Sequence, residues 1–244
     1  MPPARKSRFA DLRTLALLGA IYALWTANFA FHAWHPLPLA VHVLVAAAAI
    51  HLAFTVWHEA VHRNASPRPW VNTAVGILGM FPYLTPYFMQ RWIHLQHHAR
   101  LNERDDPNFV YVDGPFWKIA FRYPRALGTA RALLARDPRA RGECLADAAS
   151  TAAVGLVFAL AWRAGALADL LWLWLLPVAI AKLVLGHNYH AIHHLWPTIP
   201  WHGYRSTFRE RLPMLRQHGA PIEHRVFERR FRGPGLPAHT PASG

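Results

Sequence analysis

Four long apolar stretches alternate with polar segments along the chain, at residues 14–31, 37–57, 144–162 and 166–186. The first two contain no charged residue, the third contains only Asp147, and the fourth contains only Asp169 and Lys182. A helix of about 20 apolar residues crosses the roughly 30 Å hydrocarbon core of a bilayer. The connections within each pair are short, so we expect an all-α integral membrane protein whose four transmembrane helices form two hairpins.

The basic residues predict how these helices are oriented. The 244-residue chain has 26 Lys and Arg against 13 Asp and Glu, a formal net charge of +13. All the basic residues except Arg163 and Lys182 fall within residues 1–13, 58–149 and 187–244. Because Lys and Arg accumulate in cytoplasmic loops, we expect both termini and the long central loop to face the cytoplasm.

The composition argues against other classes of protein. A basic soluble domain that binds nucleic acid does not need eleven tryptophans or long uncharged runs, so we expect no nucleic-acid partner. The single cysteine, Cys144, excludes a disulfide scaffold and any cysteine-based metal cluster built within one chain. The remaining unusual feature is the presence of 17 histidines.

Eight of these histidines form three boxes: HEAVH at 58–62, HLQHH at 94–98 and HAIHH at 190–194. Residues four apart on a helix lie on one face about 6 Å apart, which suits two ligands of one metal ion. One ion takes about four to six ligands, so eight imidazoles imply two metals. The candidate ligands are His58, His62, His94, His97, His98, His190, His193 and His194.

Residues 71–90 form a fifth uncharged stretch, between Arg68 and Arg91, which Pro82 and Pro86 interrupt. If this stretch crossed the membrane, the first two boxes would lie on opposite sides of it. We therefore predict a re-entrant or interfacial helical segment, which keeps both boxes on the cytoplasmic side.

The three boxes in this order resemble the membrane fatty acid desaturase superfamily. The matching runs are HEAVH, then RWIHLQHH followed by LNERDDP, then HNYHAIHHLWPTIPW, and the similarity extends over residues 51–216. The resemblance implies a four-helix membrane enzyme in which a cytoplasmic helical cap holds a di-iron centre, with all eight box histidines as ligands. It also implies the use of dioxygen and of electrons from a redox partner. The third run further resembles the desaturase-like β-carotene hydroxylases.

Several residues outside the eight ligands are candidates for supporting roles. His187 shares a helical face with His190 and is a candidate ninth ligand. His51 lies on the face of His58 about two turns deeper, where we expect a hydrogen bond within the bundle rather than ligation. Ligating imidazoles usually donate their second N–H to a carboxylate, so Asp105 and Asp106 after the second box are expected partners. Glu59 is interpreted as a carboxylate beside the ligands or at the surface.

Two other functions compete with this interpretation. HEAVH also matches the H-E-x-x-H signature of zinc proteases, in which the glutamate acts as general base, but an intramembrane protease would leave six box histidines unexplained. A non-enzymatic basic membrane scaffold would account for the composition and would ignore the boxes.

The boxes do not choose the substrate or the product. A fatty acyl chain or a carotenoid ring such as that of β-carotene fits the chemistry, with either a hydroxyl group or a double bond as the outcome. No cytochrome b5 domain is visible in the sequence, so we expect a separate electron donor such as a ferredoxin. The C-terminal arginines are expected to attract anionic lipid headgroups. We assign residues 1–232 to one membrane-embedded domain and residues 233–244 to a disordered tail.

Overall fold

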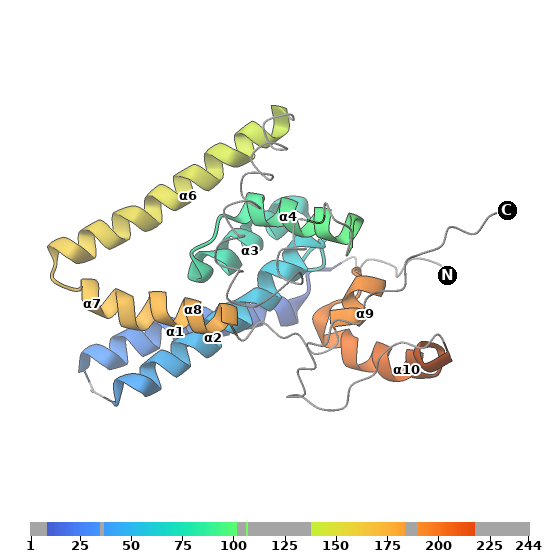
Figure 1. Cartoon of the computed structure of the whole chain (residues 1–244), viewed down its shortest axis with the longest axis horizontal. Helices are drawn as coiled ribbons and strands as arrows, with labels where there is room; N and C mark the ends of the chain where they lie inside the picture. The colour runs from blue at the N-terminus through green and yellow to red at the C-terminus, as the bar shows by residue number, and fades with distance from the viewer. Residues whose placement is uncertain (1–8, 35–36, 102–105, 107–137, 184–189, 218–244) are drawn as a thin grey trace. The chain divides into compact units, whose positions relative to one another are not determined.

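The computed structural model describes residues 9–34, 37–101, 106, 138–183 and 190–217. Within this part of the chain the regular elements are all helices, as expected (Figure 1). The chain divides into two compact units, Met1–Arg205 and Ser206–Gly244. The predicted tail at 233–244 lies outside the described residues, and the single domain at 1–232 stays a prediction.

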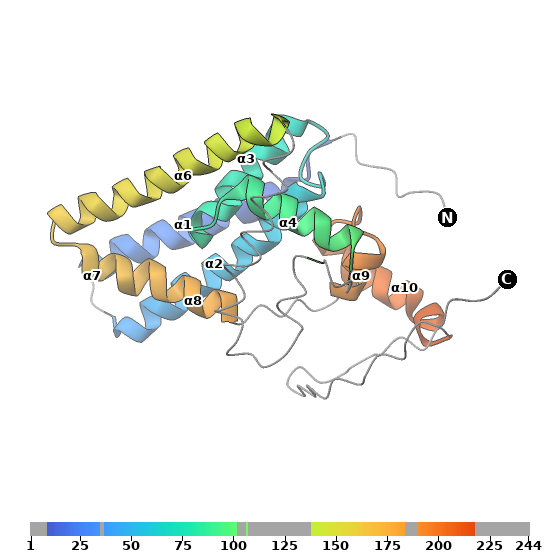
Figure 2. The same ribbon diagram turned by 45° about the horizontal axis from the view of Figure 1, so that its top comes forward.

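The first two apolar stretches form a pair of long antiparallel helices, α1 (Leu12–Trp34) and α2 (Leu39–Val61). Figures 1 and 2 both show them side by side. Ile21 and Trp25 of α1 are buried in a shared core with a small-residue face of α2, on which Ala46, Ala49 and Ala53 are fully buried. Small side chains let the two backbones approach closely, which is how helices associate in a membrane.

The second predicted hairpin consists of α6 (Pro138–Arg163) and a helical run made of α7 (Leu167–Leu170), a π-helical turn (Leu171–Leu175) and α8 (Leu176–Leu183). Gly165, with φ of 73°, makes the turn between them. Among the described residues, three helices are long and apolar enough to cross a membrane: Leu12–Trp34, Leu39–Val61 and Arg141–Arg163. The fourth predicted span ends in residues 184–186, outside the described part, so the count of four stays a prediction.

The fifth apolar stretch is helical and broken where its prolines lie. It comprises α3 (Pro69–Met80), a short 3-10 turn (Phe81–Tyr83) and α4 (Tyr87–Ala99), and Leu84 between them adopts a left-handed conformation with φ of 53°. α3 packs against α2. The indole N–H of Trp174 donates to the carbonyl of Pro82 at 2.9 Å, which ties the break to the second hairpin.

Two polar contacts hold α4 against α6. The carboxylate of Asp147 accepts the backbone N–H groups of Phe88 at 3.0 Å and of Met89 at 2.7 Å, near the start of α4. Arg91 pairs with Glu143 at 3.3 Å. Asp147, the only charged residue of the third apolar stretch, therefore caps the helix that carries the second histidine box.

At the end of the bundle away from the boxes, His42 is buried. It is 1% exposed, and its Nδ1 lies 2.9 Å from Oδ1 of Asn28, whose amide donates to the carbonyl of His42. His32 lies nearby, with Nε2 3.5 Å from the carboxylate of Asp169, which follows the turn of the second hairpin.

The third box opens α9 (His190–Leu195), which is followed by a 3-10 turn (Trp201–Gly203) and α10 (Tyr204–Gln217). The segment after the box is fastened to the start of α1, where the indole of Trp201 donates to Thr14 at 3.2 Å and His202 lies 3.3 Å from Asp11. Asn64, just after α2, donates to the carbonyl of Pro197. These contacts bring the third box to the end of α2 that carries the first box.

Candidate metal centre

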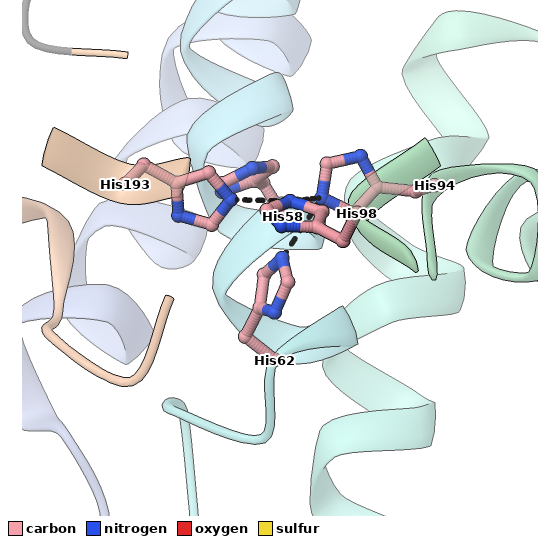
Figure 3. Close-up of side chains that lie close together, drawn as sticks. All are labelled: His58, His62, His94, His98 and His193. Atoms are coloured by element: carbon pink, nitrogen blue, oxygen red, sulfur yellow. Dashed lines mark hydrogen bonds between the residues drawn. The ribbon is translucent and has the colours of Figure 1, made fainter. Parts of the chain in front are cut away.

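Five histidines from three separate helices converge at one point (Figure 3). His58 lies on α2, and His62 directly follows the last residue of that helix. α4 contributes His94 and His98, and α9 contributes His193. One ring nitrogen from each of these five residues lies within 4.8 Å of the others. Histidines of the first and second boxes therefore belong to one site. Such a site is possible only if both boxes lie on the same side of the membrane, which the predicted non-crossing segment at 71–90 allows.

The nitrogens are spaced as ligands of a metal ion would be. Nε2 of His94 lies 2.8 Å from Nε2 of His62 and 3.1 Å from Nε2 of His98, which in turn lies 2.8 Å from Nε2 of His193. Two nitrogens bound to one ion at about 2.1 Å are themselves about 3.0 Å apart in octahedral and about 3.4 Å apart in tetrahedral coordination. A set made only of imidazole nitrogens suits a transition metal rather than calcium or magnesium. The residues present therefore fit a metal site.

His97 and His194 flank this cluster on the side of His98. Their rings lie 5.0 Å apart between centroids, and His194 stacks on His98 at 4.6 Å. Nδ1 of His97 lies 2.8 Å from a carboxylate oxygen of Asp106, the partner expected from the sequence. Seven of the eight predicted ligands are thus neighbours. The side chain of His190, together with His187 and Asp105, lies outside the described residues.

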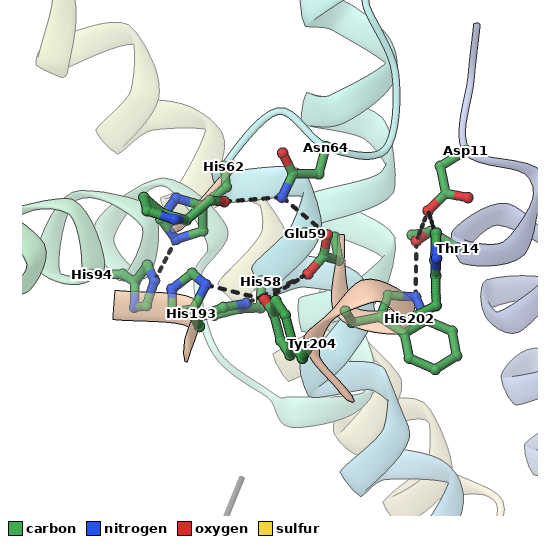
Figure 4. A network of polar contacts seen from close by, with 12 residues as sticks. Asp11, Thr14, His58, Glu59, His62, Asn64, His94, His193, His202 and Tyr204 are labelled. Atoms are coloured by element: carbon green, nitrogen blue, oxygen red, sulfur yellow. Dashed lines mark hydrogen bonds and ion pairs between the residues drawn. The ribbon is translucent and has the colours of Figure 1, made fainter. Parts of the chain in front are cut away.

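Glu59 is buried beside the cluster. Of the two locations predicted for this carboxylate, the one beside the ligands agrees with the structure, and the one at the surface is wrong. Glu59 is 0% exposed, and its carboxylate accepts the side-chain N–H of Asn64 and the hydroxyl of Tyr204, each at 3.1 Å (Figure 4). The Tyr204 oxygen also lies 3.0 Å from Nδ1 of His193. Glu59 is therefore connected to a predicted ligand through one tyrosine.

Burial determines the protonation of two groups at the site. It lowers the pKa of His94 well below the usual value, and the neighbouring histidines lower it further, so the ring is neutral and has a lone pair for a metal. Burial raises the pKa of Tyr204 above its usual range, and the Glu59 carboxylate adds to this effect. The phenol therefore keeps its proton.

Aromatic side chains cover the cluster on the side of the apolar part of α2. Phe54, one turn before His58, stacks on that ring with centroids 5.5 Å apart. Trp57 meets His94 edge to face at 5.5 Å. His51, a further turn away, is half-buried and does not belong to the group of five.

The sequence did not reveal Tyr204, Asn64 or Asp147 as residues that position the site. Tyr204 lies 145 residues from Glu59, and Asp147 lies 58 residues from Met89. The spacing of residues along the chain does not predict such pairs, because they form only when the helices pack together.

The family model described as fatty acid desaturase matches residues 32–186, more than half of the chain. The chain belongs to this family. The match covers the first two boxes and ends just before the third. The position of His193 of the third box beside the other four histidines is therefore an observation independent of the family match (Figure 3).

Individual relatives match over shorter segments. Two are named sn-1 oleoyl-lipid 12-desaturase: the protein from Anabaena variabilis is 31% identical over 104 residues, and that from Picosynechococcus sp. is 34% identical over 77 residues. A Delta(12) fatty acid dehydrogenase from Crepis alpina is 33% identical over 70 residues. The alignments cover 43%, 28% and 29% of this chain but only 28%, 22% and 18% of the respective relatives.

Family membership and the three long apolar helices together indicate an integral membrane protein. The cluster of five histidines is compatible with a metal site. The initial identification of the superfamily from its histidine boxes is confirmed.

Proposed function

We propose that this protein is a membrane di-iron enzyme that uses dioxygen to desaturate or hydroxylate a long hydrophobic lipid. The observation that carries the proposal is the convergence of five histidines from all three boxes in a chain of the fatty acid desaturase family. A zinc protease would need only three ligands, and a scaffold would need none.

In this proposal all eight box histidines hold two iron ions, and His187 is a candidate ninth ligand. His58, His62, His94, His98 and His193 form the described group, and the rings of His97 and His194 lie beside that of His98. The two ions, when bound, would supply the activation of dioxygen against an unactivated C–H bond.

The protein's own residues would orient the ligands and keep water out. Asp106 holds Nδ1 of His97, and Glu59 acts on His193 through Tyr204. Phe54 and Trp57 present an apolar surface between the cluster and the bilayer part of α2, where a hydrocarbon chain could lie against the site.

The relatives favour an acyl chain as substrate, because two of them are named as desaturases of an oleoyl lipid. The resemblance of the third box to carotenoid hydroxylases keeps a carotenoid ring as the second candidate. The outcome, a double bond or a hydroxyl group, depends on which substrate carbon lies nearest the metals.

The surroundings of the enzyme are part of the same proposal. The positive-inside distribution of the basic residues supports a cytoplasmic location for both termini and the metal centre. There a separate donor such as a ferredoxin would deliver electrons, and the basic C-terminal segment would lie near anionic headgroups. No nucleic acid takes part.

Metal analysis of the purified protein tests the proposal. We expect close to two irons per chain, loss of iron and of product in His58→Ala and His97→Ala, and retention of iron in His51→Ala on the same face of α2. One zinc without iron would support a protease, and a chain without metal would support the scaffold. Expression in a host that makes β-carotene and in one with defined saturated acyl lipids, followed by product analysis, identifies the substrate.

A further inference from the structure

The hydroxyl of Tyr204 lies between a predicted metal ligand and a buried carboxylate. Its oxygen is 3.0 Å from Nδ1 of His193 and 3.1 Å from Oε1 of Glu59. His193 and Glu59 are both 0% exposed. Because water does not reach either residue, each contact with the phenol satisfies a polar atom that would otherwise be buried at a cost.

With the Glu59 side chain ionised, the number of protons available determines the direction of both hydrogen bonds. The carboxylate of Glu59 also receives an N–H of the Asn64 side chain at 3.1 Å and the backbone N–H of Trp201, so it is surrounded by donors. The phenol has a single proton, which it donates to Glu59. Its oxygen must then accept from His193, which places the proton of that imidazole on Nδ1.

The opposite nitrogen of His193 faces the cluster (Figure 3). Its Nε2 lies 2.8 Å from Nε2 of His98. We propose that Tyr204 is a positioning residue that holds His193 in the Nδ1–H tautomer, so that Nε2 presents its lone pair to the metal. This inference rests on the proposed function, because His193 is one of the ligands of that centre.

The segment around the third box explains why such a residue is needed. α9 spans only His190–Leu195, too short to be held in place by its own backbone hydrogen bonds alone. Glu59 accepts the hydroxyl of Tyr204 (Figure 4) and the backbone N–H of Trp201 in this segment. Asn64 donates to the carbonyl of Pro197 in the same segment. Glu59 directly follows the ligand His58, so the same contacts set the first and third boxes relative to each other.

The test compares Tyr204→Phe with Tyr22→Phe. Tyr22 lies on α1 outside the cluster, and its hydroxyl donates to the backbone carbonyl of Leu78 at 2.8 Å. Each variant loses one oxygen atom, together with two hydrogen bonds in Tyr204→Phe and one in Tyr22→Phe. The purified full-length chain is titrated anaerobically with Fe²⁺ against a competing chelator. The d–d absorption of Co²⁺-loaded samples and the thermal midpoint of the metal-free protein are also measured.

We expect Tyr204→Phe to weaken Fe²⁺ binding by about 10- to 100-fold and to shift the Co²⁺ bands, as removal of a hydrogen-bond partner of a ligand does. Tyr22→Phe should bind Fe²⁺ like the wild type, even if its thermal midpoint falls by as much. Equal Fe²⁺ affinity and identical Co²⁺ spectra for Tyr204→Phe and wild type would overturn the role of Tyr204 alone. A wild-type chain that binds neither ion would overturn the metal centre itself.

Discussion

Nδ1 of His97 lies 2.8 Å from a carboxylate oxygen of Asp106, which is 5% exposed. A carboxylate in this position accepts a hydrogen bond from Nδ1–H and so leaves the lone pair of Nε2 available for a metal, as the phenol oxygen of Tyr204 does for His193. Two predicted ligands from different boxes are thus held through the same nitrogen by two different acceptors.

Replacing Asp106 should weaken metal binding without unfolding the protein. We expect Asp106→Asn to lower iron affinity by about 10- to 100-fold, because the neutral amide is a weaker acceptor for the His97 N–H. The matched control is Asp169→Asn, which alters the His32–Asp169 pair at 3.5 Å, outside the cluster. Iron content at limiting Fe²⁺ measures both. Equal losses in the two variants would show that the effect is not local to the site.

The parts of the site that the sequence predicts are those encoded by local spacing. His58 and His62, like His94 and His98, are four residues apart and meet because a helix brings such positions to one face. Asp106 follows its partner His97 by nine residues and was expected from the family pattern. The helix of the first box also extends beyond the apolar stretch that predicts it, to Val61, because the box continues the same turn.

Residues whose roles depend on packing could not be predicted in this way. The sequence alone does not show whether His42 is buried or lies at the membrane surface. In the structure its partner is Asn28, which comes from the other helix of the hairpin. Glu59 has the same ambiguity: its neighbours in sequence do not show whether a carboxylate faces water or Tyr204. In the sequence, Asp147 is a single charge near the start of an apolar stretch. Its role as a cap depends on α4 beginning beside it in the folded protein.

Two glycines, Gly79 between α3 and α2 and Gly142 on α6, differ in the space around them, and this difference predicts different effects of an alanine substitution. A Cβ atom on Gly79 would lie 2.9 Å from the backbone nitrogen and the Cβ of Trp57, a helix segment that is unable to yield. We expect Gly79→Ala to destabilise the protein by about 1–3 kcal/mol. A Cβ on Gly142 meets nothing within 4 Å, so Gly142→Ala in α6 should be neutral or slightly stabilising. Thermal midpoints in one detergent compare them, and a stable Gly79→Ala would contradict so close an approach of the two helices.

The cap that Asp147 provides to α4 should be measurable in the same way. Asp147→Ala leaves the N–H groups of Phe88 and Met89 without their side-chain acceptor, and loss of such a cap costs about 0.5–2 kcal/mol. Asp147→Asn keeps one acceptor oxygen and should recover part of the loss. Because α4 carries the second box, iron affinity should follow the same order. Identical midpoints for the Ala variant and the wild type would exclude a capping role.

The lowered pKa of His94 predicts that the metal-free protein becomes less stable as the pH falls. Burial, followed by the neighbouring His62, His98, His193 and His97, disfavours the protonated ring in the folded protein, whereas in the unfolded chain it titrates near 6.5. The unfolded state then binds more protons, so this contribution to stability is complete above about pH 6.5 and decreases below it. Between pH 7.5 and 5.5 we expect the thermal midpoint of the wild type to fall relative to that of His94→Gln, which does not titrate at this position. A difference between the two midpoints that does not change with pH would show that His94 makes no such contribution.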